Sequence, residues 1–438
     1  MATNSGASDP APSTADSSPG ADHGYPHGHA GYLDEQQVEA LTEFKRLAEE
    51  AGLYTRGPPG SIDDAALLRY LRARRWVPAD ALQQLADTSE WRQANDIDIL
   101  YNTIEVTSYE QSRRMYPQWT GRRDRRGIPL YLFVIKQLDN KSVADYERLG
   151  AEATFSRASP ENRTSAPGLL RLFALYENLT HFVMPFCTQL EDREFPDAPI
   201  TMTTNIVDIS GVGLKQFWNL KAHMQAASQL ATAHYPETLD RIFIIGAPMF
   251  FSTVWGWIKR WFDPITVSKI FILSGSEVES TLRQFIDPSN IPKKYGGDLD
   301  FSWGDLPTVD PAWDGLVEWA GDKKGFPTGP HVWRDIEGGA RMECVGLGQR
   351  DGVLREERIC VVKKTYFGDV ANAAKDRAAA AGEGATGGVA AANEEAKLSD
   401  GVAKLDIAQD EADEKSAVEV NGKEASESVS PPLPTTVA

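Results

Sequence analysis

Cysteine and long apolar runs are both scarce in this sequence. Only Cys187, Cys344 and Cys360 occur among 438 residues. Three scattered cysteines exclude a disulfide framework and a zinc knuckle, and they fit a reducing compartment. No window reaches the ~18 apolar residues that a membrane-spanning helix needs, and the N-terminus has neither the basic nor the apolar segment of a signal peptide. We therefore expect a cytoplasmic protein that is peripheral at membranes.

Positive charge is in deficit as well. The chain has 45 Lys and Arg residues against 63 Asp and Glu residues, so its formal net charge is −18. Nucleic acid is excluded as a partner, because neutralising its phosphates requires a basic stripe. Contact with a membrane surface requires only a local basic patch, and the net charge does not exclude it.

Both ends of the chain lack the apolar residues that a packed core needs. Residues 1–30 consist almost entirely of Ala, Ser, Gly, Pro, Asp and His, and residues 370–438 carry 6 Lys and Arg against 13 Asp and Glu. Such segments cannot bury enough apolar surface to offset the entropy of ordering. We expect disorder at 1–30 and an acidic disordered tail at 366–438.

Three helices are expected ahead of the main domain, within residues 31–100. Asp34 is the candidate N-cap of the first helix, Asp63 or Asp64 caps the second, and Pro78 lies just inside the third. Together these helices predict a small helical unit.

From residue 128 onward, apolar strands alternate with helices. Continuous apolar strands separated by helices predict an α/β fold, with a mixed, mainly parallel sheet and covering helices. We expect strands at 128–135, 203–209, 241–246 and 269–273, and helices at 168–184, 214–234 and 276–286.

Two stretches give a weaker pattern. Residues 138–166 predict an irregular polar insertion loop. In a C-terminal extension at 306–365, RMECVGL (341–347) and RICVV (358–362) are expected to form one edge hairpin.

Motifs that would indicate an enzyme are incomplete. The strand at 203–209 is followed by Gly211-x-Gly213, as in a dinucleotide-binding fold, but Gln216 stands in place of the third glycine. No G-x-S-x-G nucleophile elbow occurs, and the seven histidines provide no metal-binding pair. We expect no enzyme, no metal and no cofactor; a Rossmann-like oxidoreductase is the enzyme alternative, and bound flavin would reveal it.

Residues 249–262, MFFSTVWGWIKRWF, are rich in large apolar side chains. Three tryptophans in seven positions exceed what one buried stripe requires, and tryptophan prefers the bilayer interface. Lys259 and Arg260 add charge that attracts anionic headgroups. At helical spacing, one face and its flank are formed by Phe251, Val254, Trp255 and Ile258, with Trp257 and Trp261 to the side. The segment predicts a membrane-contacting lid, and an ordinary core helix is the alternative.

Six motifs occur in order between Asp63 and Trp303: ALLRYLRARRW, MYPQWTGRRDRRGIPLYL, IVDISGVG, AHYPETLDRIFIIGAP, FDPITVSKIFIL and IPKKYGG. Together they resemble the CRAL-TRIO lipid-binding family, in its fungal phosphatidylinositol/phosphatidylcholine transfer branch. The resemblance implies a CRAL-TRIO N-terminal unit at 31–100 and a lipid-binding domain at 101–305, whose apolar pocket is covered by a mobile gate helix. The implied gate and membrane-contact residues are Phe250, Phe251, Val254, Trp255, Trp257, Ile258, Trp261 and Phe262.

The resemblance also implies a site for an inositol-phosphate headgroup. It falls on Arg74, Glu237, Thr266 and Lys269, with Arg75 where the family often has lysine. Arginine and lysine supply charge and donors for phosphate. The hydroxyl of Thr266 can donate to phosphate, and Glu237 can accept from sugar hydroxyls or pair with Lys269.

A second-lipid site is implied less completely. Tyr131 and Thr203 match the family's phosphatidylcholine site, but Thr120 and Phe182 stand where tyrosines are expected, and Asn205 replaces a threonine. Fewer phenol groups remain to contact choline. Phosphatidylinositol is therefore the favoured ligand, and the second lipid is phosphatidylcholine or another lipid.

These features predict a monomeric protein that binds phospholipid and transfers it between membranes through a gated apolar pocket. Two alternatives stay open. One is a carrier of a sterol-like apolar ligand, and the other is a lipid-sensing scaffold that presents phosphatidylinositol to a lipid kinase.

Overall fold

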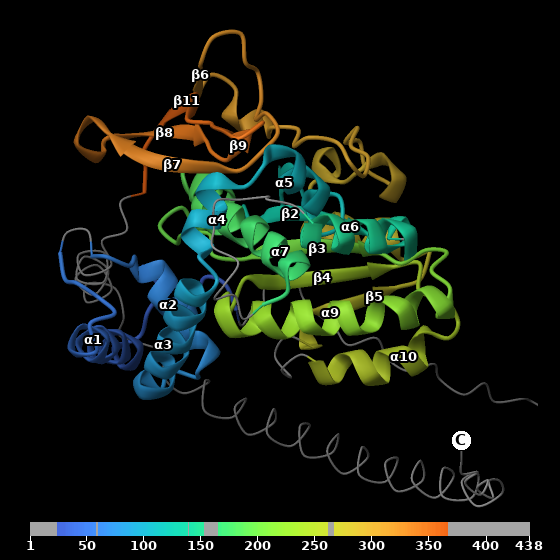
Figure 1. Cartoon of the computed structure of the whole chain (residues 1–438), viewed down its shortest axis with the longest axis horizontal. Helices are drawn as coiled ribbons and strands as arrows, with labels where there is room; N and C mark the ends of the chain where they lie inside the picture. The colour runs from blue at the N-terminus through green and yellow to red at the C-terminus, as the bar shows by residue number, and fades with distance from the viewer. Residues whose placement is uncertain (1–23, 58–59, 139, 153–164, 262–266, 367–438) are drawn as a thin grey trace, which may run out of the picture. The chain divides into compact units, whose positions relative to one another are not determined.

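The computed structural model describes residues 24–57, 60–138, 140–152, 165–261 and 267–366 (Figure 1). Residues 1–23 and nearly all of the expected acidic tail lie outside the described residues. Residues 24–30, which composition assigns to a disordered segment, are folded, because Tyr25 and His29 are buried in the core. Composition missed this segment because its glycines, prolines and histidines show no helical or strand periodicity.

The helical unit consists of three helices: α1 (Glu35–Glu50), α2 (Asp64–Ala73) and α3 (Pro78–Ala94). As predicted, Asp34 caps α1, and its side chain forms a capping box with Gln37. Asp63 caps α2. The helices close around Phe44 and Leu71, both fully buried, and this packing fixes the C-terminal end of α2.

Five strands form the main sheet, in the order β1 (Gln118–Arg123), β2 (Pro129–Val134), β3 (Thr203–Asp208), β4 (Leu239–Ile245) and β5 (Ile270–Leu273). β1 runs antiparallel to β2, and the other neighbours are parallel. The predicted mixed, mainly parallel sheet is therefore confirmed. Strand β1 was not predicted, because its sequence QWTGRR contains no apolar run.

Further α-helices are α4 (Ile97–Thr103), α5 (Val106–Arg113), α6 (Asn140–Glu152), α7 (Pro167–Asn178), α8 (Met184–Thr188), α9 (Leu214–His234), α10 (Phe251–Ile258) and α12 (Val278–Phe285). Short 3₁₀ turns are η1 (Ile135–Gln137), η3 (Lys259–Trp261), η4 (Pro288–Asn290), η5 (Lys293–Tyr295), η6 (Pro311–Trp313) and η7 (Glu337–Gly339). Helices α9 and α10 run next to each other on one side of β4 and β5 (Figure 1).

Two expectations about helices are corrected. The polar stretch 138–166 is not irregular over its first part, because it forms α6 around the buried Tyr146. The helix expected at 168–184 does not stop at Pro185. A π-helical turn, η2 (Leu179–Val183), joins α7 to α8. The π-helical turn changes the backbone hydrogen-bonding pattern, so that Pro185 falls in the first turn of α8. There the missing N–H of proline breaks no helical hydrogen bond.

The two faces of the main sheet differ in burial. On one, the closed face, Leu132, Ile206 and Phe243 are at most 2% exposed, and α12 covers them. On the other, the gate face, Phe133 and Val207 are only half-buried, although they belong to one apolar cluster with α9 and α10. The gate face is therefore the incompletely covered side of the sheet.

The C-terminal extension forms a second sheet; the two segments expected as a hairpin do pair antiparallel, but they do not lie at an edge. Four antiparallel strands lie in the order β6 (Val317–Trp319), β11 (Glu357–Lys363), β8 (Arg341–Gly346) and β7 (His331–Ile336), and a short pair is formed by β9 (Gln349–Arg350) and β10 (Val353–Leu354). The two segments predicted as a hairpin are thus the central strands of this sheet. The flanking strands were missed because VEW and HVWRDI carry a weak apolar signal.

Candidate functional site

Helix α10 packs its inner side on the gate face. Phe251 and Val254 are buried and share an apolar cluster with Phe217 of α9 and Ile242 of β4. Trp255 stacks on Phe251, with ring centroids 6.2 Å apart. Phe250 is half-buried against the same cluster. The predicted inner residues of the gate are thus brought together over the sheet.

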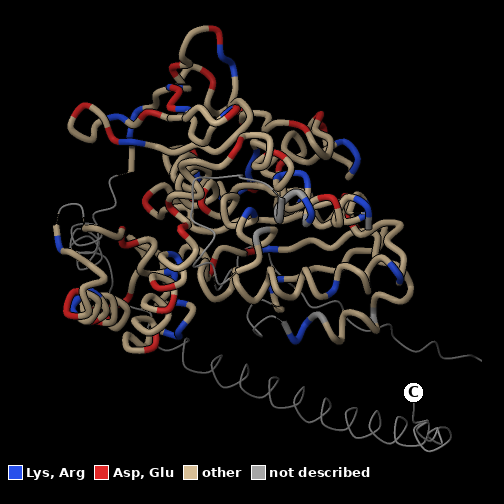
Figure 2. Tube along the Cα trace, viewed as in Figure 1, with Lys and Arg blue, Asp and Glu red and all other residues tan. Residues whose placement is uncertain are grey.

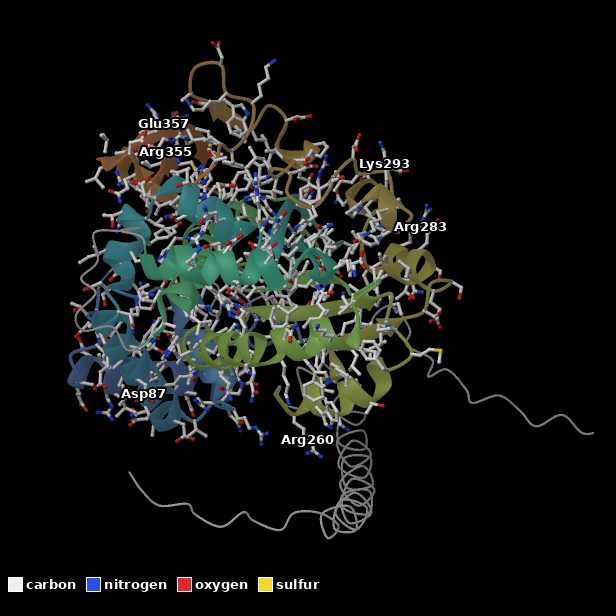
Figure 3. All side chains as sticks on the ribbon, turned by 45° about the vertical axis from the view of Figure 1, so that its right-hand side comes forward. Asp87, Arg260, Arg283, Lys293, Arg355 and Glu357 are labelled. Atoms are coloured by element: carbon white, nitrogen blue, oxygen red, sulfur yellow. The ribbon has the colours of Figure 1, made fainter. Side chains whose placement is uncertain are left out.

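The outer side of α10 carries exposed tryptophan and positive charge. Trp257 is 39% exposed and Trp218 of α9 is 46% exposed, and their ring centroids lie 5.3 Å apart. The Nζ atom of Lys221 lies 4.9 Å from the Trp218 ring. Arg260 projects beside the end of α10 (Figure 3). No Asp or Glu lies on α10 (Figure 2).

Three of the predicted gate residues are not fully described. Phe262 lies outside the described residues, and only the backbone is described for Ile258 and Trp261. Their roles stay predictions.

The gate face offers partly exposed apolar surface. α9 has 21 residues, yet among them only Phe217 and Leu220 are fully buried. Half-buried apolar side chains on the sheet and on α9 include Phe133, Val207, Met224, Leu239 and Ile270. Because apolar area removed from water contributes roughly 25 cal/mol per Å², this surface favours an apolar ligand.

A group of basic side chains, the headgroup cluster, lies at the end of α2. It comprises Arg69, Arg72, Lys269 and His29, with Glu237 as the carboxylate. Arg72 donates to the Gly28 carbonyl at 2.9 Å and to the Thr201 hydroxyl at 3.2 Å. These contacts tie α2 to the N-terminal segment and to the residues before β3.

The headgroup cluster has more buried donors than partners. Nη1 of Arg69 and Nε of Arg72 are buried without a hydrogen-bond partner. Nε2 of His29 also lacks one, but the Nδ1–H of His29 donates to the carbonyls of Pro26 and His27, so Nε2 of this neutral ring is an acceptor. Burial lowers the pKa of Arg72 to about 10, although the negative charge of Glu237 acts in the opposite direction and raises it. Burial, together with Arg72 and Lys269, lowers the pKa of His29 well below its usual value. An anion bound here would relieve this uncompensated positive charge.

The predicted headgroup residues fall at two strained turns near this cluster. Arg74 and Arg75 are exposed at the end of α2, and Arg75 has φ +50°. Glu237, between α9 and β4, has φ +56°. Such left-handed backbone is uncommon for residues with a side chain and often accompanies function. Thr266 lies outside the described residues.

The predicted second-lipid residues lie together on the gate face. Tyr131 of β2 is the register partner of Asn205 of β3. The Asn205 amide donates to the Thr203 hydroxyl at 2.9 Å, and that hydroxyl donates to the Thr238 carbonyl at 3.1 Å. Thr203 and Asn205 are therefore engaged with each other, whereas the Tyr131 hydroxyl has no hydrogen bond among the described residues.

Sequence reasoning missed Arg69, Arg72 and His29. Arg69 and Arg72 are spaced i, i+3 in ALLRYLRARRW, which places them on one helix face and could have indicated a shared site. His29 gave no signal, because its loop position depends on tertiary packing.

The remaining chemistry-bearing groups form no second centre in the described part of the chain. The α9 histidines have local partners: His223 bonds the Tyr116 hydroxyl at 2.6 Å, and His234 stacks on Trp91. Within the described ranges, no three His, Cys, Asp or Glu side chains gather as metal ligands. No helix among the described residues has the length and apolarity needed to cross a bilayer.

Comparisons with known proteins cover most of the described structure. Residues 113–297 match the family model of the CRAL/TRIO domain, and residues 35–87 match that of the CRAL/TRIO N-terminal domain. The Sec14 cytosolic factor of Schizosaccharomyces pombe is 30% identical over 279 residues, which cover 64% of this chain and 88% of that protein.

Two further similarities are more distant or more partial. The phosphatidylinositol/phosphatidylcholine transfer protein SFH9 of Arabidopsis thaliana is 28% identical over 274 residues, covering 60% of this chain and 42% of that protein. The crystal structure of Sfh5 has a TM-score of 0.43 at 15% identity, over 64% of this chain and 94% of that one. The CRAL/TRIO match contains β1 to β5, α9 and α10, and the C-terminal sheet lies beyond it.

Proposed function

The chain belongs to the CRAL-TRIO family, in its Sec14-like branch, and on this premise we propose that it binds phosphatidylinositol and transfers it between membranes. The observation that carries the proposal is the pairing of two surfaces on one domain. One is the half-buried apolar gate face beneath α10, and the other is the headgroup cluster with its unpartnered buried donors. A phospholipid is a ligand that needs both.

The headgroup cluster supplies the chemistry that a phosphorylated headgroup requires. Arg72 and Lys269 provide positive charge for phosphate, and charge-assisted hydrogen bonds are stronger than neutral ones. Glu237 provides an acceptor for sugar hydroxyls. We extend the site to Arg69 and Arg72 because their unpartnered nitrogens are buried, and Arg74, Arg75 and Thr266 remain part of the proposed site.

Transfer follows from the cost of exposing acyl chains. Each CH₂ moved from a membrane into water costs about 0.8 kcal/mol, so spontaneous desorption of a diacyl lipid is slow. An apolar cavity that opens against the bilayer avoids most of this exposure. Trp218 and Trp257, with Lys221 beside them, suit the interface of an anionic membrane.

The mechanism we infer has four steps: docking through the tryptophans, displacement of α10, exchange of lipid on the gate face, and release. The protein then handles lipid without changing it covalently. It acts as a monomer at the membrane surface and is cytoplasmic between encounters.

Transfer is tested with labelled phosphatidylinositol in donor vesicles and unlabelled acceptor vesicles. We expect catalytic amounts of the full chain to move label at a rate proportional to protein concentration. Retention of one lipid per protein without transfer would contradict transport and would favour a scaffold that presents phosphatidylinositol to a lipid kinase. Absence of both binding and transfer would overturn the proposal.

A further inference from the structure

A cavity of about 50 Å³ lies where the main sheet meets the C-terminal extension. Its wall includes Tyr109, Trp119, Tyr131, Phe182, Phe326 and His331. Phe326 and His331 come from the extension, which lies outside the CRAL/TRIO match. The rings pack closely, because the Phe182 centroid lies 4.7 Å from that of Phe326 and 5.8 Å from that of Trp119. The extension therefore completes one wall of this cavity.

The charged groups in the wall are already satisfied. Nε of Arg113 donates to Glu110 at 2.8 Å, and its two terminal nitrogens donate to the carbonyls of Asp305 and Gly304. The other Glu110 oxygen accepts from the Gly329 N–H at 3.0 Å. No charged group of the wall is thus left to neutralise a phosphate.

Two polar atoms of wall residues have no partner. Trp119 is 7% exposed and His331 is 3% exposed, and Nε1 of Trp119 and Nε2 of His331 are buried without a hydrogen bond. Burial lowers the pKa of His331 to about 3, so its imidazole is neutral near pH 7. An unpartnered buried polar atom is destabilising, so an occupant that bonds either atom would be stabilised.

An uncharged hydroxyl matches these atoms better than a phosphocholine group. A hydroxyl accepts from the Trp119 N–H, and it can donate to His331 or accept from it, whichever ring nitrogen carries the proton. Phosphocholine has no hydrogen to donate and brings a charge that the wall does not pair. One water needs roughly 10–15 Å³, so the cavity holds a hydroxyl with a few neighbouring carbon atoms.

Contacting apolar side chains join the cavity wall to the gate face. Leu175 lines the cavity and packs with Met115 in the cluster around Tyr116 and Leu172. Met115 also packs with Phe133 in the gate-face cluster. The cavity wall and the gate face therefore belong to adjoining apolar clusters.

We propose that this cavity binds the hydroxyl end of a neutral lipid, a sterol or a diacylglycerol, and that the C-terminal sheet thereby determines the identity of the second lipid. The inference rests on the proposed function, since it concerns the same gate face. Trp119 and His331 are its specificity-determining residues.

The test uses the purified full chain and phosphatidylethanolamine vesicles that contain one probe at a time: ergosterol, dioleoylglycerol, phosphatidylcholine or phosphatidylinositol. Lipid retained by the re-isolated protein is quantified by mass spectrometry. We expect retention of ergosterol or dioleoylglycerol, and a fall of about fivefold to tenfold in the Trp119→Phe and His331→Phe variants, because each loses one buried hydrogen bond. Retention of phosphatidylinositol should not change.

The Trp91→Phe variant is the matched control, because the Trp91 indole donates to Ser165 outside the cavity. Trp119→Phe keeps an aromatic ring, so it remains informative if His331→Phe folds poorly. Retention of phosphatidylcholine but neither hydroxyl lipid, or equal retention by wild type and Trp119→Phe, would overturn the inference while phosphatidylinositol binding stands. Loss of phosphatidylinositol in the wild type would instead contradict the proposed function.

Discussion

Two arginine side chains of the headgroup cluster carry positive charge with nitrogen atoms buried from water. Arg69 and Arg72 share one face of α2, and Glu237 is the only carboxylate among the groups that shift the pKa of Arg72. Burying a charge without a full set of partners costs stability. The sequence predicted Lys269 and Glu237 through their motifs, but it could not predict which arginines of α2 are buried, because that depends on how residues 24–30 fold over the helix.

Replacing Arg72 with methionine should separate binding from stability. The Arg72→Met change removes two hydrogen bonds and also an uncompensated buried charge, so the free energy of unfolding should change by less than about 1 kcal/mol. Retention of phosphatidylinositol should fall at least about tenfold, because a charge-assisted bond is lost. Urea unfolding and lipid mass spectrometry measure the two effects.

The exposed Arg283, which pairs with Glu279 at 2.9 Å, provides the matched control for that change. Arg283→Met should alter neither quantity. Unchanged lipid retention in Arg72→Met would remove Arg72 from the site.

The buried histidines predict how stability depends on pH. The folded-state pKa of His331 is about 3, below its ordinary value, so the unfolded chain takes up a proton first as pH falls. The stabilisation is therefore present above about pH 6.5 and is lost toward pH 3, at up to about 1.4 kcal/mol per pH unit. Urea unfolding at pH 7 and pH 5 should show a loss of about 2 kcal/mol from His331.

His331→Phe should reduce that loss, because it removes the titrating imidazole. An identical pH dependence in wild type and His331→Phe would show that His331 is not buried in its neutral form.

Helix α10 combines an inner face fixed by packing with an outer face suited to a membrane. Its apolar spacing predicted that Phe251 and Val254 share one helix face, and both are buried. The partnership of Trp257 with Trp218 was not predicted, because it joins two helices that are distant in sequence. The same limit explains the C-terminal sheet: its two central strands pair as predicted, but the strands that flank them were missed because such neighbours depend on contacts beyond the local pattern.

Removal of the outer tryptophans should weaken docking without unfolding the protein. The Trp218→Ala, Trp257→Ala double variant should bind anionic vesicles about tenfold less tightly, because interfacial tryptophan and apolar area are lost. Vesicle co-sedimentation measures the change. Leu316→Ala, which alters an exposed side chain near the second sheet, should have no effect, and an equal loss in both variants would refute docking through α10.

Truncation of the inner face should loosen the gate. Val254→Ala removes two buried methyl groups and should cost about 1–2 kcal/mol. If α10 opens as a local unit, its amide hydrogens should exchange about fivefold to thirtyfold faster, while the core strand β3 exchanges at its original rate. Equal acceleration in β3 would indicate global destabilisation and would contradict an independently opening gate.

Across the domain, one sheet separates a closed side from an incompletely covered side. The closed face and α12 form a buried apolar core, while the gate face, α9 and α10 carry the half-buried apolar side chains that we propose contact lipid. The alternation of strands and helices was enough to predict strands β2 to β5 of this sheet, although not β1. It could not predict the second sheet, whose strands are short and partly polar, or the cavity that the second sheet completes.

Mass spectrometry of retained lipid tests most directly whether phosphatidylinositol binds at the headgroup cluster. The full chain is incubated with mixed phospholipid vesicles and re-isolated, and wild type is compared with Lys269→Ala and with the control Lys293→Ala, whose exposed partner is Asp300 at 3.2 Å. We predict that wild type and Lys293→Ala retain phosphatidylinositol and that Lys269→Ala retains at least about tenfold less. Equal retention by all three, or no phosphatidylinositol in any, would contradict the account.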